Sequence, residues 1–549
     1  MKCTGAQIAV KQLLAHGADI VFGYPGGAVL PLYDELYQNS GQIRHILTAH
    51  EQGAAHAADG YARASGKTGV VIATSGPGAT NLVTGVANAY LDSVPLVAVT
   101  GNVSVPLLGR DSFQEVDIMG ITQSIVKHNY VVRDVAALED TLNEAFHIAG
   151  SGRRGPVLVD IPKSVQTDVC EYKGLPPAQE DKKPCSFDIE KIAEAIKGCK
   201  KPYIYAGGGV IASGAEAELR ELSERLSAPV GFSMMGLSAL PDDYALNLGM
   251  TGMHGKYAAT VAKSECDLIL ALGVRFSDRG TGDVREYSEG KHIIHVDIDL
   301  AEIGKNVSSH MEVCGDVKDV LTRLLPLLPA ARNGEWLARV GELKRLGRET
   351  YQSGGFTPRS IIETVRRFCG DDTVVATDVG QHQMWVTMHY RFQKPRTLLS
   401  SGGLGAMGYG LGAAIGGCLA KNGQRTVLFT GDGSFGMNLT ELATAVSQSL
   451  PVTVVVLNNN ALGLPRQWQS VFFGERYSQS TLNRKTDFAA LAKAFGADGY
   501  LAETLPQLES ALESLPADRP AVIDCRIGID EKVLPMIPPG GSVKDIIME

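Results

Sequence analysis

One stretch of the chain carries residue types that suit the binding of a divalent cation and a diphosphate. Asp432 follows the apolar run RTVLFT within G-D-G, and the next apolar run, PVTVVV, leads to the asparagines that include Asn459. Both runs predict buried parallel strands, whose carboxyl ends meet at one edge of a sheet. Mg²⁺ prefers hard oxygen ligands, and a helix predicted to start after Ser434 favours an anion at the same place. G-D-G alone is more often a simple turn, but the asparagines after the next strand favour the metal site.

An acidic residue near the start of the chain could transfer protons. Glu51 follows a strand-like segment and begins a predicted helix of small residues, EQGAAHAADGYARASG. A carboxylate in an apolar pocket is suited to proton exchange, because burial disfavours its charged form. The alternative is that Glu51 only balances the dipole of its helix. The residue pattern around Glu51 leaves both interpretations open.

Composition restricts the partners of this chain. Its 549 residues carry a formal charge of −9 without a basic stripe, which argues against binding to nucleic acid or to an anionic membrane. No run of about 18 apolar residues predicts a membrane span, and the first residues predict an amphipathic helix, not a signal peptide. The nine cysteines include no C-x-x-C pair, as is typical of a reduced chain without a zinc site. We expect a cytoplasmic protein that acts on small molecules.

Predicted strands and helices alternate along the whole chain. These elements position the candidate residues described above. Continuous apolar runs, typical of parallel strands covered on both faces, recur in three regions with helical patterns between them. The predicted fold class is α/β, with three doubly wound parallel-sheet domains. A stretch rich in proline and charge, 170–187, and a polar helical stretch, 336–357, are interpreted as linkers. The predicted domains are residues 1–169, 188–335 and 358–549.

Ordered sequence phrases along nearly the whole chain resemble those of acetolactate synthase (acetohydroxyacid synthase) catalytic subunits, a family of thiamine-diphosphate enzymes. The run from G-D-G to the asparagine pair resembles the diphosphate and metal motif of that superfamily. The other matching phrases are YPGGAVLPLYD, EQGAAHAADGYARASG, SGPGATN, FQEVDI, GPVLVDIPKSVQ, GMHG, GVRFSDR, DVGQHQMW, SGGLGAMGYG and RQWQ. The resemblance implies a pyrimidine-binding domain and a diphosphate-binding domain that flank a central Rossmann-like domain.

The resemblance also implies roles for individual residues. Glu51 would exchange a proton with the aminopyrimidine, and Met407 would wedge the cofactor into a bent shape. The metal ligands would be Asp432, Asn459 and the carbonyl of Ala461, and the catalytic positions would also include Gly27, Gln114 and Lys127. The cofactor surroundings would be Val379, Gly380, Gln381, His382, Gly405, Gly433, Ser434 and Met437, and the substrate positions Phe113, Arg279 and Trp468. The alternative for Met407, Met437 and Trp468 is a place in the core or in an interface.

The central domain resembles the FAD-binding unit of the same family. Gly207, Gly208 and Gly209 lie between an apolar run and a helical pattern, so backbone could approach a phosphate closely. Three glycines alone are often only a turn. Together with GMHG and GVRFSDR, the resemblance implies FAD, without net redox chemistry, near Met253, His254, Arg275 and Asp297.

The implied activity is decarboxylation of pyruvate on thiamine diphosphate with Mg²⁺ present. The hydroxyethyl unit would then join a second pyruvate or 2-oxobutyrate, a step of branched-chain amino acid biosynthesis. The alternatives are another thiamine-diphosphate 2-oxo acid decarboxylase, an FAD-dependent pyruvate oxidase or a non-catalytic homologue. Because Glu51 and Asp432 belong to different domains, we expect interfacial active sites in a homodimer or homotetramer. The sequence leaves open whether a small regulatory subunit is a further partner.

Three positions depart from the family pattern. Ser277 replaces one member of an acidic pair, Leu464-Pro465 stands in place of Met-Val, and Gly412 stands in place of Pro. Pro465 lacks a backbone donor and favours an extended conformation at Leu464. These departures bear on substrate preference and loop closure.

Overall fold

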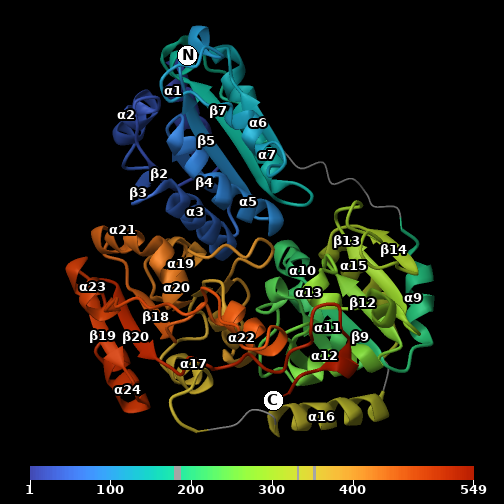
Figure 1. Cartoon of the computed structure of the whole chain (residues 1–549). Coiled ribbons are helices and arrows are strands. Elements are labelled where there is room, and N and C mark those ends of the chain that lie inside the picture. The colour runs from blue at the N-terminus through green and yellow to red at the C-terminus, as the bar shows by residue number, and fades with distance from the viewer. Residues whose placement is uncertain (179–186, 331–332, 350–353, 549) are drawn as a thin grey trace.

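The computed structural model describes residues 1–178, 187–330, 333–349 and 354–548. Three α/β domains follow one another along the chain, and each is built on a six-stranded parallel sheet covered by helices (Figure 1). The N-terminal domain lies against the C-terminal domain, and the central domain lies beside the C-terminal one. This confirms the predicted fold class. None of the helices in the described part of the chain has the length and apolar character needed to cross a bilayer.

The N-terminal sheet has the strand order β3-β2-β4-β5-β7-β6. Its strands are β2 (Ile20–Tyr24), β3 (Arg44–Leu47), β4 (Gly69–Ala73), β5 (Leu96–Asn102), β6 (His128–Val131) and β7 (Pro156–Pro162). Its helices are α1 (Gly5–Ala15), α2 (Leu30–Gln38), α3 (Glu51–Ser65), α4 (Pro77–Asn81), α5 (Val83–Leu91), α6 (Ile118–Thr122), α7 (Leu138–Gly150) and α8 (Lys163–Thr167). Strands β4, β5 and β7 are buried along their whole length, as their continuous apolar runs predict.

The central sheet has the order β11-β10-β9-β12-β13-β14. Its strands are β9 (Pro202–Ala206), β10 (Val230–Phe232), β11 (Asn247–Met250), β12 (Leu268–Leu272), β13 (His292–Asp297) and β14 (Met311–Cys314). Its helices are α9 (Ile189–Lys197), α10 (Gly208–Ser213), α11 (Glu216–Leu226), α12 (Tyr257–Glu265), α13 (Asp278–Thr281), α14 (Val284–Ser288), α15 (Val317–Leu324) and α16 (Gly334–Glu349).

The C-terminal sheet has the order β16-β15-β17-β18-β20-β19. Its strands are β15 (Val375–Thr377), β16 (Leu398–Leu399), β17 (Thr426–Gly431), β18 (Val452–Asn458), β19 (Asp498–Ala502) and β20 (Ala521–Arg526). Its helices are α17 (Pro358–Arg367), α18 (Gln381–His389), α19 (Tyr409–Ala420), α20 (Asp432–Asn438), α21 (Leu442–Ser447), α22 (Gly463–Phe472), α23 (Phe488–Ala494) and α24 (Leu505–Glu513).

Both segments interpreted as linkers contain structure. Strand β8 (Val169–Glu171) pairs antiparallel with β1 (Lys2–Thr4), so the N-terminal domain continues past residue 169. In the second segment, α16 packs on the central domain: Trp336 is buried, and its indole N–H donates to the Pro202 carbonyl oxygen at 3.0 Å. The apolar residues of α16 lie along one face of the helix. The other faces are polar, and this is why the segment was interpreted as a linker.

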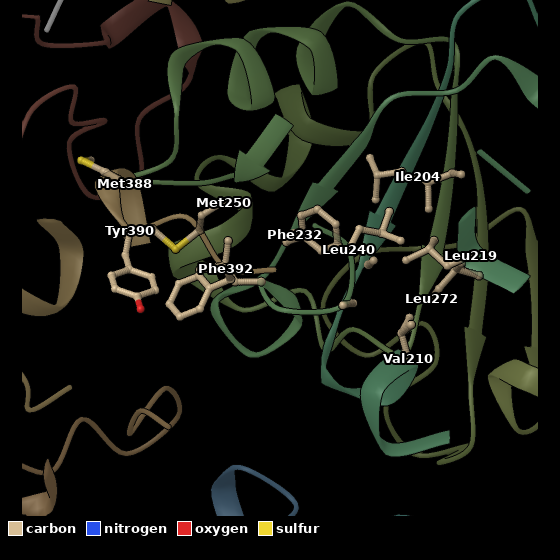
Figure 2. Packing of buried hydrophobic residues seen from close by; sticks show 14 of the residues in the cluster. Ile204, Val210, Leu219, Phe232, Leu240, Met250, Leu272, Met388, Tyr390 and Phe392 are labelled. Atoms are coloured by element: carbon tan, nitrogen blue, oxygen red, sulfur yellow. The ribbon is translucent and has the colours of Figure 1, made fainter. Parts of the chain in front are cut away.

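Two apolar cores hold the domains together. One core continues from the central sheet to the end of α18 and the segment after it, where Met388, Tyr390 and Phe392 approach Met250 (Figure 2). The other core joins α3 of the N-terminal domain to α19 of the C-terminal domain. A buried hydroxyl reinforces this contact, because Tyr409 on α19 donates to Asp59 on α3 at 2.7 Å.

Candidate functional site

The candidate cation site lies where the C-terminal sheet reverses its strand order. Strands β15 and β17 are neighbours, but the chain leaves them toward opposite edges of the sheet. Helices α18 and α20 begin directly after these strands, so their first residues meet above the carboxyl ends. Ligands of open α/β sheets bind at such a switch point.

Asp432 is the first residue of α20 and is buried at this edge. Burial, with a smaller contribution from the nearby Asp524 carboxylate, raises the pKa of its carboxyl group to about 6. Its Oδ1 atom is buried and has no hydrogen-bond partner among the described residues, as is expected of an oxygen that binds a cation. The helix begins at Asp432, and not after Ser434 as the sequence suggested. Ser434 therefore lies within the first turn, where its hydroxyl donates to the Val379 carbonyl oxygen at 2.8 Å.

Asn459 follows β18 and is buried beside the same edge. Its amide nitrogen donates to Gln381 Oε1 at 3.1 Å, and its Oδ1 accepts the backbone N–H of Ala461 at 3.2 Å. These bonds turn the asparagine oxygen and the 459–461 backbone toward one another. Among the described residues, no three His, Cys, Asp or Glu side chains form a metal cluster. A cation here would therefore rely on one carboxylate with amide and backbone oxygens, a donor set that suits Mg²⁺.

The loop before α19 brings the predicted cofactor-contacting residues against this edge. The Met407 methyl group is near Gly433, where a Cβ would lie 3.8 Å from it. A Cβ at Gly405, whose φ is +71°, would lie 3.9 Å from Val379. Met437 lies beside Gly408 and is 61% exposed. The exposed Met437 side chain disagrees with a simple core-filling role.

His382 packs against the backbone of both strand-end turns that form the candidate site. Its ring packs against Gly380 and Gly431, where a Cβ would come within 2.8 and 3.0 Å of ring atoms. Burial lowers the pKa of His382 to about 3, so the ring is neutral at physiological pH. Its Nε2 is buried without a hydrogen-bond partner. Glycines at both positions therefore let the ring pack between the loop after β15 and the last residue of β17.

Asp378 and Glu441 are buried carboxylates of this region that sequence reasoning did not select. Asp378 Oδ1 accepts the backbone N–H of Gly408 at 2.7 Å, which fixes the loop that carries Met407. Glu441 accepts the backbone N–H groups of Ala49 and His50 at 3.2 and 3.0 Å. Asp378 lies in the matched phrase DVGQHQMW and could have been found there. The partners of Glu441 are almost four hundred residues away in sequence, and no local pattern indicates them.

Glu51 is the first residue of α3 and lies at the carboxyl edge of the N-terminal sheet. Its side chain is 9% exposed, and its Oε2 accepts a hydrogen bond from Asn81 Nδ2 at 2.9 Å. The helix cap comes from the His50 ring, which accepts the Gln52 N–H at 3.1 Å. Within the described chain, the hydrogen-bond partner of Glu51 thus comes from its own domain.

The other predicted catalytic residues of this domain lie on loops. Gly27 is in the exposed turn after β2, where a Cβ would meet no atom within 4 Å. Gln114 has a φ of +58° and packs against Gly76 of the turn after β4. Phe113 beside it is 87% exposed. Lys127 instead points to the end of α7, where its ammonium donates to the carbonyl oxygens of Ile148 and Ser151.

A cavity of about 1420 Å³ opens beside the switch point of the central sheet, between β9 and β12. Gly208, Gly209, Arg275 and Asp297 line it together with residues of the two other domains. A Cβ at Gly209 would lie 2.6 Å from Gly273, so the glycines also let the two strand-end loops pack closely. Gly207 packs on the same loop but does not line the cavity.

Met253 and His254 lie outside this cavity, so the residues predicted around FAD fall into two groups. Burial lowers the pKa of His254 to about 4. The Met253 N–H donates to the Arg279 carbonyl oxygen at 2.8 Å. The Arg279 guanidinium lies 5.7 Å from the centre of the Trp468 ring on α22. The two predicted substrate residues from different domains are thus brought together.

Two positions that depart from the family pattern have local explanations. Leu464 and Pro465 both lie in the first turn of α22, so the expected extended conformation at Leu464 is not found. A missing N–H is tolerated there because the first helical N–H groups have no intrahelical partner. A Cβ at Gly412 would lie 2.8 Å from the Gly53 carbonyl oxygen, so glycine allows α19 to approach α3 closely.

Comparison with known families agrees with this architecture. Three family models match the chain in order: the thiamine pyrophosphate enzyme N-terminal TPP-binding domain over residues 3–121, the central domain over 189–324 and the C-terminal TPP-binding domain over 378–525. Each match falls within one of the three α/β domains.

Curated relatives match over almost the full length. The Escherichia coli acetolactate synthase isozyme 1 large subunit is 44% identical over 100% of this chain and 98% of its own. A probable acetolactate synthase large subunit of Methanocaldococcus jannaschii is 43% identical over 99% and 95%, and an acetolactate synthase of Mycobacterium bovis is 44% identical over 99% and 91%. The chain therefore belongs to the acetolactate synthase large-subunit family of thiamine pyrophosphate enzymes.

Proposed function

We propose that this chain is the catalytic subunit of an acetolactate synthase. It would decarboxylate pyruvate and transfer the two-carbon unit to a second pyruvate or to 2-oxobutyrate. The observation that carries the proposal is the buried, unpartnered Asp432 oxygen beside Asn459, at the switch point of a chain from this family. A non-catalytic homologue would have no need to keep a buried carboxylate oxygen without a partner.

Asp432, Asn459 and the Ala461 carbonyl would hold Mg²⁺, and the metal would hold the diphosphate. The donor set and the glycines of the adjoining turns fit both groups. Bound thiamine diphosphate supplies a cationic ring that accepts the electron pair left by decarboxylation. Val379, Gly405, Met407 and Met437 would support its aminopyrimidine.

Glu51 would hold the proton that is exchanged with the aminopyrimidine. Its side chain is buried, and the Asn81 amide fixes the direction of the carboxyl group. The function of Asn81 in this proposal is positional, because it acts through Glu51.

Arg279 and Trp468 would bind the second 2-oxo acid. A guanidinium over an indole ring presents fixed donors to a carboxylate next to an apolar surface. Phe113, Gln114 and Gly27 would complete the channel from the N-terminal domain. Lys127 would act there only through the loop that it fixes, because its ammonium already serves two carbonyl groups.

We also propose that the large cavity of the central domain binds FAD. It is wide enough for a dinucleotide, and the Gly208-Gly209 backbone lies at its sheet edge. Burial raises the pKa of Asp297 to about 6, yet its Oδ1 accepts the Asp299 N–H, a geometry in which a ribose hydroxyl could be a further partner. A flavin absorption spectrum of the purified protein tests the assignment.

The active site would form between two copies of the chain. Glu51 is bonded within its own domain, while exposed apolar side chains gather at the carboxyl edges of both cofactor-binding domains. These side chains are Tyr24, Leu30, Leu47, Phe113, Leu404 and Met437. Because relatives are described as large subunits, a small regulatory subunit would be a further partner.

The function is tested by Glu51→Gln, which keeps the size of the side chain and a partner for Asn81. Acetolactate formation from pyruvate should fall by roughly 100-fold or more, because the proton relay is lost. Thiamine diphosphate should remain bound, as measured by equilibrium dialysis with Mg²⁺. Glu35→Gln, on the surface-facing helix α2, is the matched control. Full turnover of Glu51→Gln would contradict the assignment.

The product separates this proposal from its two nearest alternatives. A synthase yields acetolactate, which gives acetoin after acid treatment. A simple decarboxylase releases a free aldehyde, and a pyruvate oxidase produces peroxide. Aldehyde or peroxide as the main product would reject the synthase.

A further inference from the structure

A second, smaller cavity lies between the central domain and the C-terminal tail. Its volume is about 70 Å³, enough for a few water molecules or one small ion. One wall is formed by α12 and the segment from Asp278 to Lys291, and the other by residues Ile537 to Lys544. The tail is held there by two backbone bonds, from Ile537 N–H to Met253 O and from Asp283 N–H to Gly541 O.

A buried lysine without a carboxylate partner lines this cavity. The Lys263 ammonium donates to the Gly280 carbonyl oxygen at 2.7 Å and lies 4.8 Å from the centre of the Tyr287 ring. In the described part of the chain, no carboxylate lies within ion-pair distance of it. Burial, with a smaller contribution from the nearby Lys291, lowers the pKa of Lys263 to about 7. A buried ammonium is costly unless an anion accompanies it.

Lys291 adds a second cationic side chain to the same cavity. It is 8% exposed, and its ammonium donates to the backbone oxygens of Glu286 and Glu289 at 3.4 and 3.3 Å. These are long bonds to neutral acceptors. Neither lysine is therefore neutralised by the chain as described.

The acidic residues around the cavity are already engaged. Asp283 accepts the backbone N–H groups of Arg285 and Glu286 at the start of α14. Glu286 pairs with Lys544 at 3.3 Å, and Asp278 lies 3.7 Å from Arg279. Four cationic side chains (Lys263, Arg279, Lys291 and Lys544) and three anionic ones (Asp278, Asp283 and Glu286) line the cavity, so its formal charge is positive by one when Lys263 is protonated.

We propose that this cavity binds a small oxyanion, a phosphate or a carboxylate, between Lys263 and Lys291. The bound ion would join the Asp278–Lys291 segment to the C-terminal tail. Arg279 lines the cavity, and its guanidinium also lies over the Trp468 ring. An ion bound in the cavity would therefore restrict the position of Arg279 on the side away from Trp468. The proposal does not depend on the catalytic activity.

The test measures thermal unfolding of the full chain in phosphate, in acetate and in chloride at equal ionic strength. Phosphate or acetate at about ten times its dissociation constant should raise the midpoint over chloride by roughly 1 °C if the chain unfolds as one unit, and by roughly 4 °C if the central domain unfolds alone. A response to phosphate alone identifies a phosphate site, and a response to acetate as well identifies a general carboxylate and phosphate site. An equal midpoint in all three salts overturns the proposal.

Variants at Lys263 separate this cavity from the diphosphate site, which also attracts phosphate. Lys263→Met removes the buried charge, and Lys263→Gln keeps a donor for the Gly280 carbonyl. Both should fold and lose the oxyanion response that depends on the cavity, whereas Lys200→Met, at an exposed lysine of the same domain, should keep it. If either Lys263 variant responds like the native chain, the proposal is wrong.

Tail protection provides a second measurement. A bound oxyanion should slow tryptic cleavage after Lys544 in the native chain and leave the rate unchanged in Lys263→Gln. Equal protection of both proteins would also overturn the proposal.

Discussion

Two carboxylates, Asp378 and Asp432, are buried at the carboxyl edge of the C-terminal sheet. Burial raises the pKa of both Asp378 and Asp432 to about 6. Asp378 is compensated by backbone and hydroxyl donors, whereas Asp432 Oδ1 has no partner. The two residues therefore differ in function: Asp378 fixes a loop, and Asp432 is available for a ligand.

Asp432→Asn should raise the stability of the metal-free chain at pH 7. A carboxyl group whose pKa is higher in the folded than in the unfolded chain loses its stabilising contribution as the pH rises from about 4 to about 6. At pH 7 the native residue is ionised and buried, and the amide removes that cost.

The same variant should lose the stabilisation that Mg²⁺ with thiamine diphosphate gives the native chain. Differential scanning calorimetry with and without the two ligands measures both effects. Asp530→Asn, at an exposed aspartate, is the control. An undiminished ligand-induced shift in Asp432→Asn would remove Asp432 from the metal site.

At the scale of elements, close contact between α3 and α19 joins the N-terminal and C-terminal domains. The contact uses small residues, because a Cβ at Gly416 would overlap the Ala57 carbonyl oxygen and one at Gly60 would overlap Ala413. Polar groups are buried at its margin, where Arg63 pairs with Asp59 at 2.6 Å. Such a contact holds the first turn of α3, and Glu51 with it, at a fixed place relative to the loop before α19.

Gly416→Ala should destabilise the chain by about 1–3 kcal/mol, because the added methyl group cannot fit without moving α3 from α19. Gly341→Ala is the matched control on α16, where a Cβ would meet no atom within 4 Å. That substitution should stabilise by about 0.5–1 kcal/mol through helix propensity. Urea unfolding measures both changes. Equal effects of the two substitutions would show that the α3–α19 contact is looser than the structure indicates.

At the scale of the whole molecule, one chain presents two incomplete halves of a cofactor site. The N-terminal domain carries Glu51, and the C-terminal domain carries the proposed cation ligands together with an exposed Met437. Exposed apolar side chains surround both edges, and patches of this kind mark association surfaces. A dimer in which the N-terminal domain of one copy contacts the C-terminal domain of the other accounts for the divided site and for the exposed apolar side chains.

Leu47→Glu should weaken dimerisation and activity together. Leu47 ends β3, four residues before Glu51, and is 50% exposed, so a carboxylate there would oppose burial in an interface. Leu501→Glu is the matched control, because Leu501 is 49% exposed on the far edge strand β19. Sedimentation equilibrium and acetolactate assays over a dilution series measure the two effects. A dimeric, fully active Leu47→Glu would place the interface elsewhere.

The sequence by itself determined the fold class, most of the central strands and which candidate site residues follow which strand. The apolar runs of β7, β9 and β17 could be predicted because strands buried on both faces need continuous apolar residues. Asp432 and Asn459 were identifiable because strand ends fix their neighbours within a few residues. The family resemblance rests on such local phrases, and the full-length matches confirm it.

Only the tertiary structure decided which distant residues meet. The anchoring of α3 by Glu441, the stacking of Arg279 on Trp468 and the packing of α16 on the central sheet join segments far apart in the chain. The exposed position of Met437 and the burial of Lys263 against the Gly280 carbonyl oxygen likewise cannot be read from the sequence. Local sequence patterns indicate which face of a helix or strand is apolar. They do not indicate which other element packs against that face, because this depends on how whole domains pack together.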